Sequence, residues 1–272
     1  MRLSIIINHY KSRELLRLCL KSVLENVSGG FEIIVRDGEA QDETVEMMRE
    51  EFPRIAYLPE KENVGFARLV NAGILASKGD FIFNINADIV IPEKGLVEIL
   101  VAYLADHPET GMIGPKLLNM NDTLQRSAFR FYKPLTLLYR RTILGKTPWG
   151  ARDLARFLMQ NIDVEHAKAP ISVDWIMGSA MLATRKAIEK VGLLDDSYFM
   201  YMEDVDWCRR FWEAGYKVMY HPGVAFIHYH MQASRGRRGF LDVLTNKYTR
   251  IHARSAARYF WKHGLRVPRY GM

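Results

Sequence analysis

The segment LSIIINHYKSRELLRLCLKSVLENVSGGFEIIVRD, residues 3–37, decides the fold class of this chain. It opens with an unbroken apolar run, continues with leucines and valines at a helical period, and closes with a second apolar run. Because neither run alternates with polar residues, we expect strands covered on both faces, as in a parallel sheet. A strand, a helix and a strand at this spacing predict a βαβ unit.

The same alternation continues to about residue 105. The predicted strands are 3–8, 31–35, 55–58 and 81–85, and the predicted helices are 15–24, 43–51, 66–76 and 96–105. This order predicts an α/β protein with a doubly wound, mostly parallel central sheet flanked by helices.

The periodicity weakens from Gly111. We expect residues 119–170 to form a long excursion with one helix at 152–161. After it we expect a strand pair, or a strand entering a turn, in 173–184, a helix at 203–214, short strands at 217–220 and 224–228, and one or two helices in 240–263. No repeat or Gly/Ser-rich linker occurs, which favours one domain, 1–234, with a helical C-terminal extension, 235–272.

The composition is that of a folded globular protein. Of the 272 residues, 49% are hydrophobic and 25% are charged, which excludes disordered and collagen-like chains. Only two cysteines occur, Cys19 and Cys208, so a disulfide framework is excluded and a reducing compartment is expected. No apolar run reaches the roughly 18 residues of a membrane span, and the first run is too short for a signal peptide. We therefore expect a cytoplasmic protein.

Positive charge is concentrated near the C-terminus. Residues 235–272 hold ten basic residues and one acid, a charge of +9; because the whole chain carries +7, residues 1–234 sum to −2. Aromatic residues lie between these basic residues, and the combination suits nucleic acid or an anionic membrane surface. A solvated helix face is the alternative. No sequence pattern of a nucleic-acid-binding module is present, so we expect no nucleic-acid partner.

Polar residues follow four of the predicted strands. They are Asn8, His9, Tyr10, Asp37, Asp42, Asn63, Gly65, Asn86 and Asp88. Ligands of parallel α/β sheets bind outside the carboxyl ends of the strands, and this set suits a base edge, a ribose and a metal-bound diphosphate. Neither GxGxxG nor a Walker sequence occurs, so a dinucleotide fold and a P-loop nucleotidase are not supported.

Two groups of residues are candidates for chemistry, and each has a structural alternative. The first is a possible metal site formed by Asp88 and by His228 and His230. Asp88 follows the apolar run FIFNIN; it suits Mg²⁺ or Mn²⁺ together with a diphosphate, or is a turn residue before Pro92. His228 and His230 face one side of a strand and could bind metal or pack structurally.

The second candidate is the segment MEDVD, which places Glu203, Asp204 and Asp206 at a helix start. There they could stabilise the helix dipole, or one of them could act as a general base. Because neighbouring helical residues point about 100° apart, at most one of Glu203 and Asp204 can face a given substrate atom.

Six segments in this order resemble the family 2 glycosyltransferases of the GT-A fold, closest to a bacterial rhamnosyltransferase-like branch. They are SIIINHYKS (4–12), IIVRDGEAQDET (33–44), ENVGFARLVNAGI (62–74), NINAD (84–88), GMIGPKLLNMNDTLQRSAFRF (111–131) and VDWIMGSAMLATRKAIEKVGLLDDSYFMYMEDVDWCRRFWEAGYKV (173–218). The resemblance covers nearly all of residues 1–265. The chain departs from the family pattern at Lys11, Gly38, Ala40 and Glu43, and HYHMQAS (228–234) lacks the family's glycine.

This resemblance implies inverting transfer of a sugar from a nucleoside diphosphate to a hydroxyl of a glycan or lipid-linked acceptor, in polysaccharide or glycolipid synthesis. Residues 1–110 would be the nucleotide-sugar half and 111–234 the acceptor half. A divalent metal, Mg²⁺ or Mn²⁺, would be held by Asp88 and His228, and Asp204 would be the base, with Glu203 as the alternative. The donor contacts implied are His9, Tyr10, Asp37, Asn63, Gly65 and Asn86, and the acceptor contacts are Trp175, Gly178 and Ser179, with Arg126 and Arg130 toward acceptor phosphates.

The identity of the sugar stays open between rhamnose from a dTDP donor and galactose, glucose or N-acetylglucosamine. A non-catalytic sugar-nucleotide-binding protein is a further alternative, against which the presence of both Asp88 and Asp204 argues. A basic stripe of Arg250, Arg254, Arg258 and Lys262 would bring residues 235–270 to an anionic membrane, at the inner face of the cell membrane. A basic helix contacting a second copy of the chain, as a homodimer, is the other partner considered.

Overall fold

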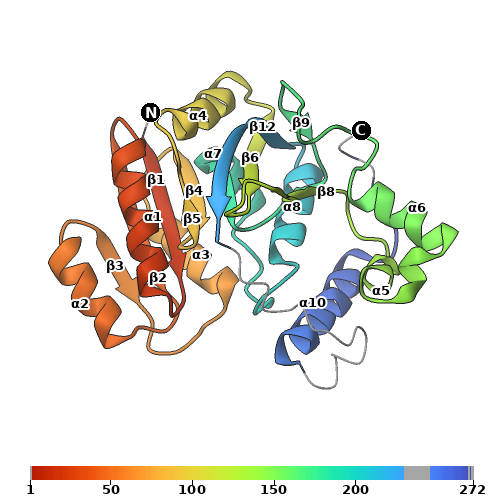
Figure 1. The fold of residues 1–272 in the computed structure, drawn as a ribbon, viewed down its shortest axis with the longest axis horizontal. Helices are drawn as coiled ribbons and strands as arrows, with labels where there is room; N and C mark the ends of the chain where they lie inside the picture. The colour runs from red at the N-terminus through yellow and green to blue at the C-terminus, as the bar shows by residue number, and fades with distance from the viewer. Residues whose placement is uncertain (1, 230–245, 269, 271–272) are drawn as a thin grey trace.

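The computed structural model of the chain describes residues 2–229, 246–268 and 270. A central sheet runs through these residues with helices on both faces, and the C-terminal helix lies beside the second half of the chain (Figure 1). The predicted class, a mostly parallel sheet flanked by helices, is confirmed.

The first half of the chain alternates as predicted. Its elements are β1 (Leu3–His9), α1 (Arg13–Asn26), β2 (Phe31–Asp37), α2 (Asp42–Glu51), β3 (Ala56–Pro59), α3 (Phe66–Ala76), β4 (Phe81–Asn86), β5 (Ile89–Val90) and α4 (Leu96–Asp106). Only the two-residue strand β5 was not expected.

The second half holds more structure than the sequence predicted. Its elements are β6 (Thr110–Leu118), β7 (Leu124–Gln125), β8 (Ala128–Phe129), α5 (Thr136–Arg141), the 3₁₀ helix η1 (Ile143–Lys146), α6 (Pro148–Phe157), β9 (Ile171–Ser172), β10 (Trp175–Ile176), β11 (Ala180–Thr184), α7 (Arg185–Val191), α8 (Glu203–Glu213), β12 (Lys217–His228) and α10 (Lys247–His263).

Several predictions for this half were wrong in detail. The strand β6 and the helix α7 were missed. One helix was expected in 119–170, at 152–161, but this range also holds α5, η1 and two short strands, and α6 starts four residues before the predicted helix. β12 is one strand with a register shift, where two short strands were expected. The predicted helix start at 240, the domain boundary between 234 and 235, and His230 lie outside the described residues.

The main sheet has the strand order β3-β2-β1-β4-β11-β6-β12-β5. The first four strands are parallel, and β11 is antiparallel to both of its neighbours. β6 and β12 are again parallel to each other. The carboxyl ends of β2, β1 and β4 therefore meet at one edge, where ligands of such sheets bind.

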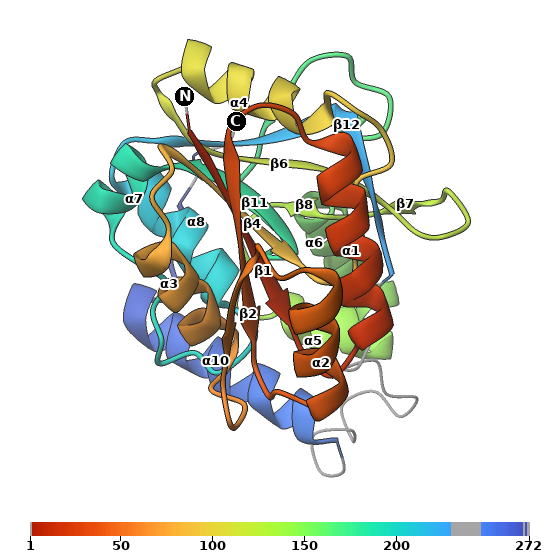
Figure 2. The same cartoon turned by 90° about the vertical axis from the view of Figure 1, so that its left-hand side faces the viewer.

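Successive side chains of each strand point to opposite faces, which gives the protein two apolar cores. In β1, Ile6 packs in the core under α3, α7 and α8, whereas Ile5 and Ile7 pack in the core under α1, α2 and α4. Figure 2 shows α1 and α2 on one side of the sheet and α3 and α8 on the other. Both faces of the central strands are covered, as the unbroken apolar runs predicted.

The helix α10 is fixed to the domain by apolar packing and by charge. Tyr259 is buried in the same core as α8, and Lys262 and His263 contact the carboxylate of Asp206 on α8. Within the described part of the chain, no helix has the length and hydropathy that crossing a bilayer would require.

Candidate active site

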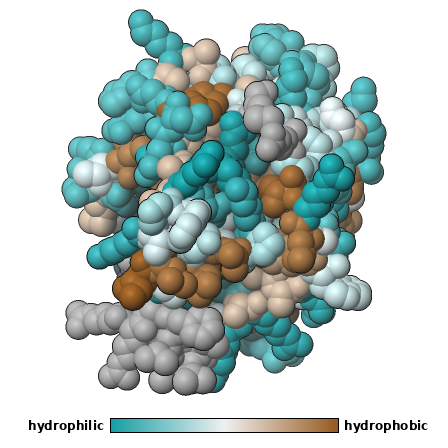
Figure 3. Space-filling view, turned by 90° about the vertical axis from the view of Figure 1, so that its right-hand side faces the viewer, coloured by the Kyte–Doolittle hydropathy of each residue, from teal (hydrophilic) through white to brown (hydrophobic). Residues whose placement is uncertain are grey.

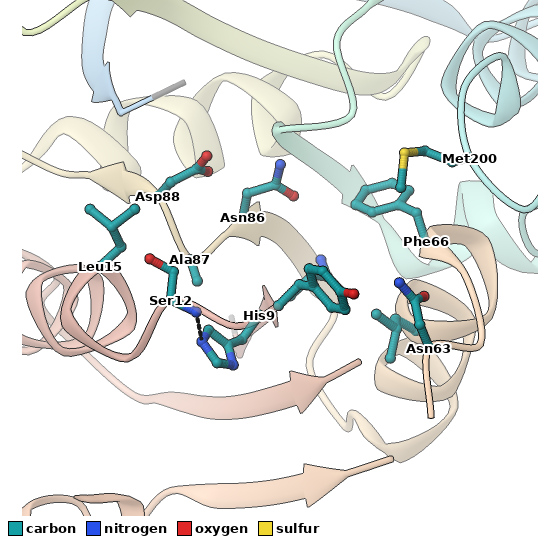
Figure 4. Close-up of a pocket in the computed structure, with 12 residues that line it drawn as sticks. His9, Ser12, Leu15, Asn63, Phe66, Asn86, Ala87, Asp88 and Met200 are labelled. Atoms are coloured by element: carbon teal, nitrogen blue, oxygen red, sulfur yellow. Dashed lines mark hydrogen bonds between the residues drawn. The ribbon is translucent and has the colours of Figure 1, made fainter. Parts of the chain in front are cut away.

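A pocket opens at the sheet edge formed by the carboxyl ends of β1 and β4. Its lining residues are Asn8, His9, Tyr10, Ser12, Leu15, Asn63, Phe66, Leu69, Asn86, Ala87, Asp88 and Met200. Figure 4 shows Asn86 and Asp88 on one wall, with Phe66 and Met200 on the other. Five of the residues predicted to contact the donor or the metal, namely His9, Tyr10, Asn63, Asn86 and Asp88, thus line one pocket.

His9 and Asp37 form a buried pair beside this pocket. The Nδ1 atom of His9 lies 3.0 Å from Oδ1 of Asp37, and neither side chain is exposed. Nε2 of His9 accepts a hydrogen bond of 2.9 Å from the Ser12 N–H, the contact drawn in Figure 4. A neutral imidazole with its proton on Nδ1 satisfies both contacts, so the ring is held in one orientation.

Asp37 is satisfied inside the protein. Its Oδ2 accepts a hydrogen bond of 2.7 Å from the Tyr57 hydroxyl. Burial alone would raise the pKa of Asp37, but the contacts with His9 and Tyr57 outweigh it and lower that pKa. Because Asp37 has no exposed side-chain surface, it contributes to the pocket by holding His9. Tyr57 was not singled out in the sequence, since nothing local to AYLP connects it with a residue twenty positions away.

Asp88 and His228 meet at the rim of the pocket, brought together by the pairing of β12 with β5. Oδ1 of Asp88 lies 3.2 Å from Nε2 of His228, and no hydrogen bond from the described residues satisfies that buried oxygen. Nδ1 of His228 lies 2.6 Å from Oε1 of Gln125, which orients the ring with Nε2 toward Asp88. Gln125, on β7, was missed.

This arrangement fits a divalent metal. No group of three or more ligating side chains gathers anywhere in residues 2–229, 246–268 and 270, so a metal here would have few protein ligands. One carboxylate and one imidazole beside a diphosphate is the kind of partial ligand set with which Mg²⁺ and Mn²⁺ bind when the substrate supplies further oxygens.

Gly65 shapes the opposite wall. Its N–H donates to Oδ1 of Asn63 at 2.9 Å, and its φ is 89°, a left-handed value. A Cβ atom on Gly65 would lie 2.6 Å from the carbonyl oxygen of Phe199, which itself accepts the Phe66 N–H. The start of α3 can therefore approach residues 199–200 only because residue 65 is glycine.

Asp204 lies behind this wall at the start of α8. Its Oδ2 accepts a hydrogen bond of 3.0 Å from the Gly178 N–H. A Cβ atom on Gly178 would contact both the Phe66 ring and Asp204, which places Asp204 next to a residue that lines the pocket. Burial raises the pKa of Asp204 above the ordinary range of an aspartate, as expected for a general base held in a partly desolvated site.

Glu203 is the poorer candidate for the base. Its side chain is buried, and Oε2 has no hydrogen-bond partner in the described structure. Burial and the neighbouring charge of Asp204 raise the pKa of Glu203. Asp204 is the better candidate, because backbone N–H groups hold both of its carboxylate oxygens next to Gly178.

A buried chain of hydrogen bonds connects β1 with Asp204. Nδ2 of Asn8 donates to Oδ1 of Asn84 at 2.7 Å, and Nδ2 of Asn84 donates to the carbonyl of Gly178 at 3.1 Å. Gly178 in turn donates to Asp204. Asn84 was missed, although it is the one polar residue that interrupts the apolar run of β4, and a buried amide needs partners.

Asp206, the third carboxylate of the MEDVD segment, faces away from the pocket. It is fully buried, and three side chains contact it: Arg210 at 2.8 Å, Lys262 at 2.8 Å and the His263 ring at 2.7 Å. Two of them belong to α10, so Asp206 anchors that helix. The predicted basic stripe is corrected accordingly, because Lys262 is paired with Asp206 and Asp195, whereas Arg250, Arg254 and Arg258 are exposed.

The predicted acceptor residues are more buried than expected. Trp175 stacks on Phe129 with ring centroids 4.5 Å apart, and its Nε1 donates to the carbonyl of Arg130. Ser179 is buried, and its carbonyl accepts the Asn86 N–H.

The two arginines expected to meet acceptor phosphates have partners inside the protein. Arg130 lies 3.2 Å from Asp174, and Arg126 donates to the carbonyl of Leu158.

The sequence and the fold both match known glycosyltransferases. The model of the family described as glycosyl transferase family 2 matches residues 4–159, more than half of the chain. The chain belongs to glycosyl transferase family 2. Within it, a relative from Mycobacterium tuberculosis named N-acetylglucosaminyl-diphospho-decaprenol L-rhamnosyltransferase is 27% identical over 216 residues, 75% of this chain and 68% of the relative. The rhamnosyltransferase WbbL of Escherichia coli is 39% identical over 87 residues, 32% of this chain and 30% of the relative.

Solved structures of other glycosyltransferases share the GT-A fold of this family 2 glycosyltransferase. The mannosyltransferase PcManGT from Pyrobaculum calidifontis, in complex with GDP-Man and Mn²⁺, has a TM-score of 0.61 at 18% identity and is matched over 98% of this chain and 65% of its own length. GalNAc-T7 with UDP, GalNAc and Mn²⁺ has a TM-score of 0.67 at 14% identity, over 96% of this chain and 48% of its own length. The predicted family, branch and fold are confirmed.

Proposed function

We propose that this family 2 glycosyltransferase is a divalent-metal-dependent, inverting enzyme that moves a sugar from a nucleoside diphosphate to an acceptor hydroxyl. The observation that carries the proposal is the placement of one carboxylate in the pocket lining and of a second next to that lining. Asp88 lines the wall that suits a metal-bound diphosphate. Asp204 does not line the pocket, but it lies next to Gly178, which borders the lining residue Phe66. Transfer with inversion needs one group at the leaving diphosphate and one at the attacking hydroxyl.

The donor would bind along the carboxyl ends of β1 and β4. The ring of Tyr10, which is 44% exposed, is available to stack on the nucleobase. His9, fixed by Asp37 and Ser12, offers a rigid edge behind it. Asn63 and Asn86 offer amide groups for the ribose and the diphosphate. Rigid placement of the donor lowers the entropic cost of reaching the transition state.

Asp88 and His228 would hold the metal, which supplies charge neutralisation at the leaving diphosphate. A cage of many protein ligands is not needed, because diphosphate oxygens complete the coordination. The Mn²⁺ in the two structural neighbours supports a divalent ion in this fold.

Asp204 would take the proton of the acceptor hydroxyl as the hydroxyl attacks the anomeric carbon. Burial raises its pKa, which brings its basicity closer to neutral pH. The Gly178 N–H and the Val205 N–H each donate to one of its oxygens, so the carboxylate is held in one orientation. Asn8 and Asn84 hold the Gly178 loop and so position Asp204.

Rhamnose from a dTDP donor is the sugar that we propose first, because two relatives are rhamnosyltransferases. The name of the mycobacterial relative contains a diphospho-polyprenol, and we propose a lipid-linked acceptor for this chain as well. Galactose, glucose and N-acetylglucosamine are the alternatives for the sugar.

A donor screen tests the proposal. Melting temperatures are measured with thymidine, uridine and guanosine diphosphate sugars, each with Mn²⁺, with Mg²⁺ or with a chelator. We expect a metal-dependent rise with one nucleotide class, since a ligand that binds only the folded state stabilises it. The same donors give no such rise with Asp88→Ala. If no nucleotide sugar raises the melting temperature under any metal condition, the proposed donor site is wrong.

We also propose that the enzyme works at the inner face of the cell membrane, with residues 235–270 near anionic lipid. The exposed residues Arg250, Arg254 and Arg258 recur every four positions along α10. Replacing all three with Gln is expected to weaken co-sedimentation with anionic vesicles. If that variant co-sediments as wild type does, α10 does not contact the membrane.

A further inference from the structure

Residues 133–152, which comprise α5, η1 and the first turns of α6, form a second basic surface, called here the α5–α6 surface. Five basic residues and no acid occur in it: Lys133, Arg140, Arg141, Lys146 and Arg152. The three elements pack on one another, so the residues belong to one continuous body. The sequence had shown only the charge of the C-terminal tail.

Several of these cations are available to a partner. Lys146 and Arg152 are exposed, and within the described part of the chain neither contacts a carboxylate. Arg140 is exposed too, and donates to the hydroxyl of Tyr132 while its guanidinium lies over an aromatic ring. Lys133 differs, because Asp153 lies 3.4 Å from it.

Large apolar side chains project from the same surface. Ile143 is 81% exposed and Trp149 is 78% exposed, with Leu135 and Leu144 also exposed. Figure 3 shows this side of the molecule, where hydrophobic residues gather in a band among hydrophilic ones. Clustered exposed apolar residues mark interaction sites, and Trp beside Lys and Arg is the composition of protein surfaces that lie in the headgroup region of a bilayer.

The α5–α6 surface is continuous with α10 and with the rim of the pocket. Arg141 of α5 contacts His252 of α10 at 3.0 Å, and the Tyr201 ring stacks on His252. Ser255 of α10 donates to the carbonyl of Met200, a residue that lines the pocket. The α5–α6 surface is thus connected through α10 to a residue of the donor pocket.

We propose that the α5–α6 surface docks the enzyme on an anionic lipid bilayer, with Ile143 and Trp149 in the headgroup region and Arg140, Lys146 and Arg152 against lipid phosphates. This rests on the proposed function in one respect, because a lipid-linked acceptor requires the pocket to open near a bilayer. A bilayer fits better than nucleic acid, since a phosphate backbone offers nothing to an exposed isoleucine, whereas the headgroup boundary buries it.

Vesicle binding tests this surface with matched variants. The full chain is sedimented with phosphatidylglycerol-containing and with phosphatidylcholine vesicles. One variant carries Ile143→Ser and Trp149→Ser, and another carries Lys146→Gln and Arg152→Gln. The controls are Leu75→Ser, which alters a 74% exposed leucine on α3, and Arg49→Gln on α2. A cooperative melting transition at the wild-type temperature, measured without nucleotide, shows that each variant is folded.

We expect wild type and both controls to bind the anionic vesicles and to release at high salt. Each surface variant should lose about tenfold or more in partition coefficient. The Lys146→Gln and Arg152→Gln variant loses two basic residues, each of which contributes roughly a fivefold factor near an anionic surface. The Ile143→Ser and Trp149→Ser variant loses the apolar area that the headgroup region would bury. With Trp261→Phe as background, Trp149 becomes the exposed tryptophan of the described chain, and its emission should shift to the blue on anionic vesicles.

Three results would overturn the proposal: no binding of wild type at low salt, equal losses in the controls, or protection of Trp149 by duplex DNA or a second copy of the chain in place of lipid. Donor binding and transfer to a water-soluble acceptor are measured without vesicles. Their failure with intact vesicle binding would count against the proposed function alone, and the reverse result would count against the surface alone.

Discussion

Asp204 and Asp206 lie two residues apart on α8, and the structure predicts that replacing them has opposite consequences. Asp206→Asn removes the charge that Arg210, Lys262 and His263 contact, and leaves the cations Arg210 and Lys262 beside a neutral amide. We expect a loss of stability with sugar transfer retained, because Asp206 contacts Lys262 and His263 of α10, whereas Asp204 lies next to Gly178 beside the pocket. Asp204→Asn should instead lower transfer and leave stability nearly unchanged.

The size of the loss can be worked out in two ways. Breaking a buried ion pair costs about 3–5 kcal/mol, and here the cost falls because Lys262 keeps Asp195 and Arg210 keeps two carbonyl partners. Burial alone would raise the pKa of Asp206, but the hydrogen bond with His263 and the contacts with Arg210 and Lys262 outweigh it and lower that pKa to about 2. Relative to an ordinary aspartate, such a pKa corresponds to about 2 kcal/mol of stability at neutral pH. We therefore expect a loss of about 2–3 kcal/mol.

Thermal unfolding measures this loss. For a chain of this size about 2–3 kcal/mol corresponds to a fall of roughly 5–10 °C in melting temperature. The folded-state pKa of Asp206 lies below the unfolded one, so its contribution is complete above about pH 4 and disappears as the pH falls toward 2. The melting temperatures of wild type and Asp206→Asn should therefore converge in acid.

The matched control is Glu213→Gln, further along α8. Its carboxylate is 40% exposed and pairs with Arg209, so the substitution should cost under about 1 kcal/mol. If Asp206→Asn melts as wild type does at neutral pH, or if the two do not converge in acid, the buried charge network does not anchor α10 as argued.

Three further predictions concern the pocket. Asp204→Asn should keep donor binding and lower the transfer rate by roughly 10²–10⁴-fold. Because burial raises the pKa of Asp204, wild-type transfer should rise with pH as that carboxyl loses its proton. Normal turnover of Asp204→Asn together with an inactive Glu203→Gln would reverse the two roles. Asp88→Ala should abolish the Mn²⁺-dependent part of the nucleotide affinity measured by calorimetry, without lowering the melting temperature of the free protein. A nucleotide affinity that is unchanged in the presence of Mn²⁺ would refute the metal site. Gly65→Ala should weaken nucleotide binding more than Gly30→Ala does, because only the former meets a backbone oxygen at 2.6 Å; equal binding by both would contradict the close approach of α3 to residues 199–200.

The first half of the fold could be predicted because its signals are local. Strands such as β1 and β4 are continuous apolar runs, and the helices between them carry a clear period of 3.6. The strand β6 lacks that signal, because Gly111, Gly114 and Pro115 all disfavour a strand. Pairing with β11 and β12 makes it a strand, and Gly111 is required there by the close approach of Phe211.

The pocket was half predictable for a related reason. Parallel strands must end at one edge of the sheet, so Asn8, Asn86 and Asp88 could be placed together from their positions after apolar runs. Their partners could not be predicted. Tyr57 reaches Asp37 through the pairing of β3 with β2, and Gln125 reaches His228 across about a hundred residues of chain, contacts that no local pattern encodes.

The sequence by itself determined the fold class and the family, because both are written in local periodicity and in the order of short motifs. It also placed Glu203, Asp204 and Asp206 at the start of one helix. Only the tertiary structure decided what each carboxylate does. Asp204 accepts the Gly178 N–H beside the pocket, Glu203 is buried next to another carboxyl group, and Asp206 contacts Arg210 of α8 and Lys262 of α10. The three groups are chemically alike, and only burial and the neighbours brought by distant segments make them differ.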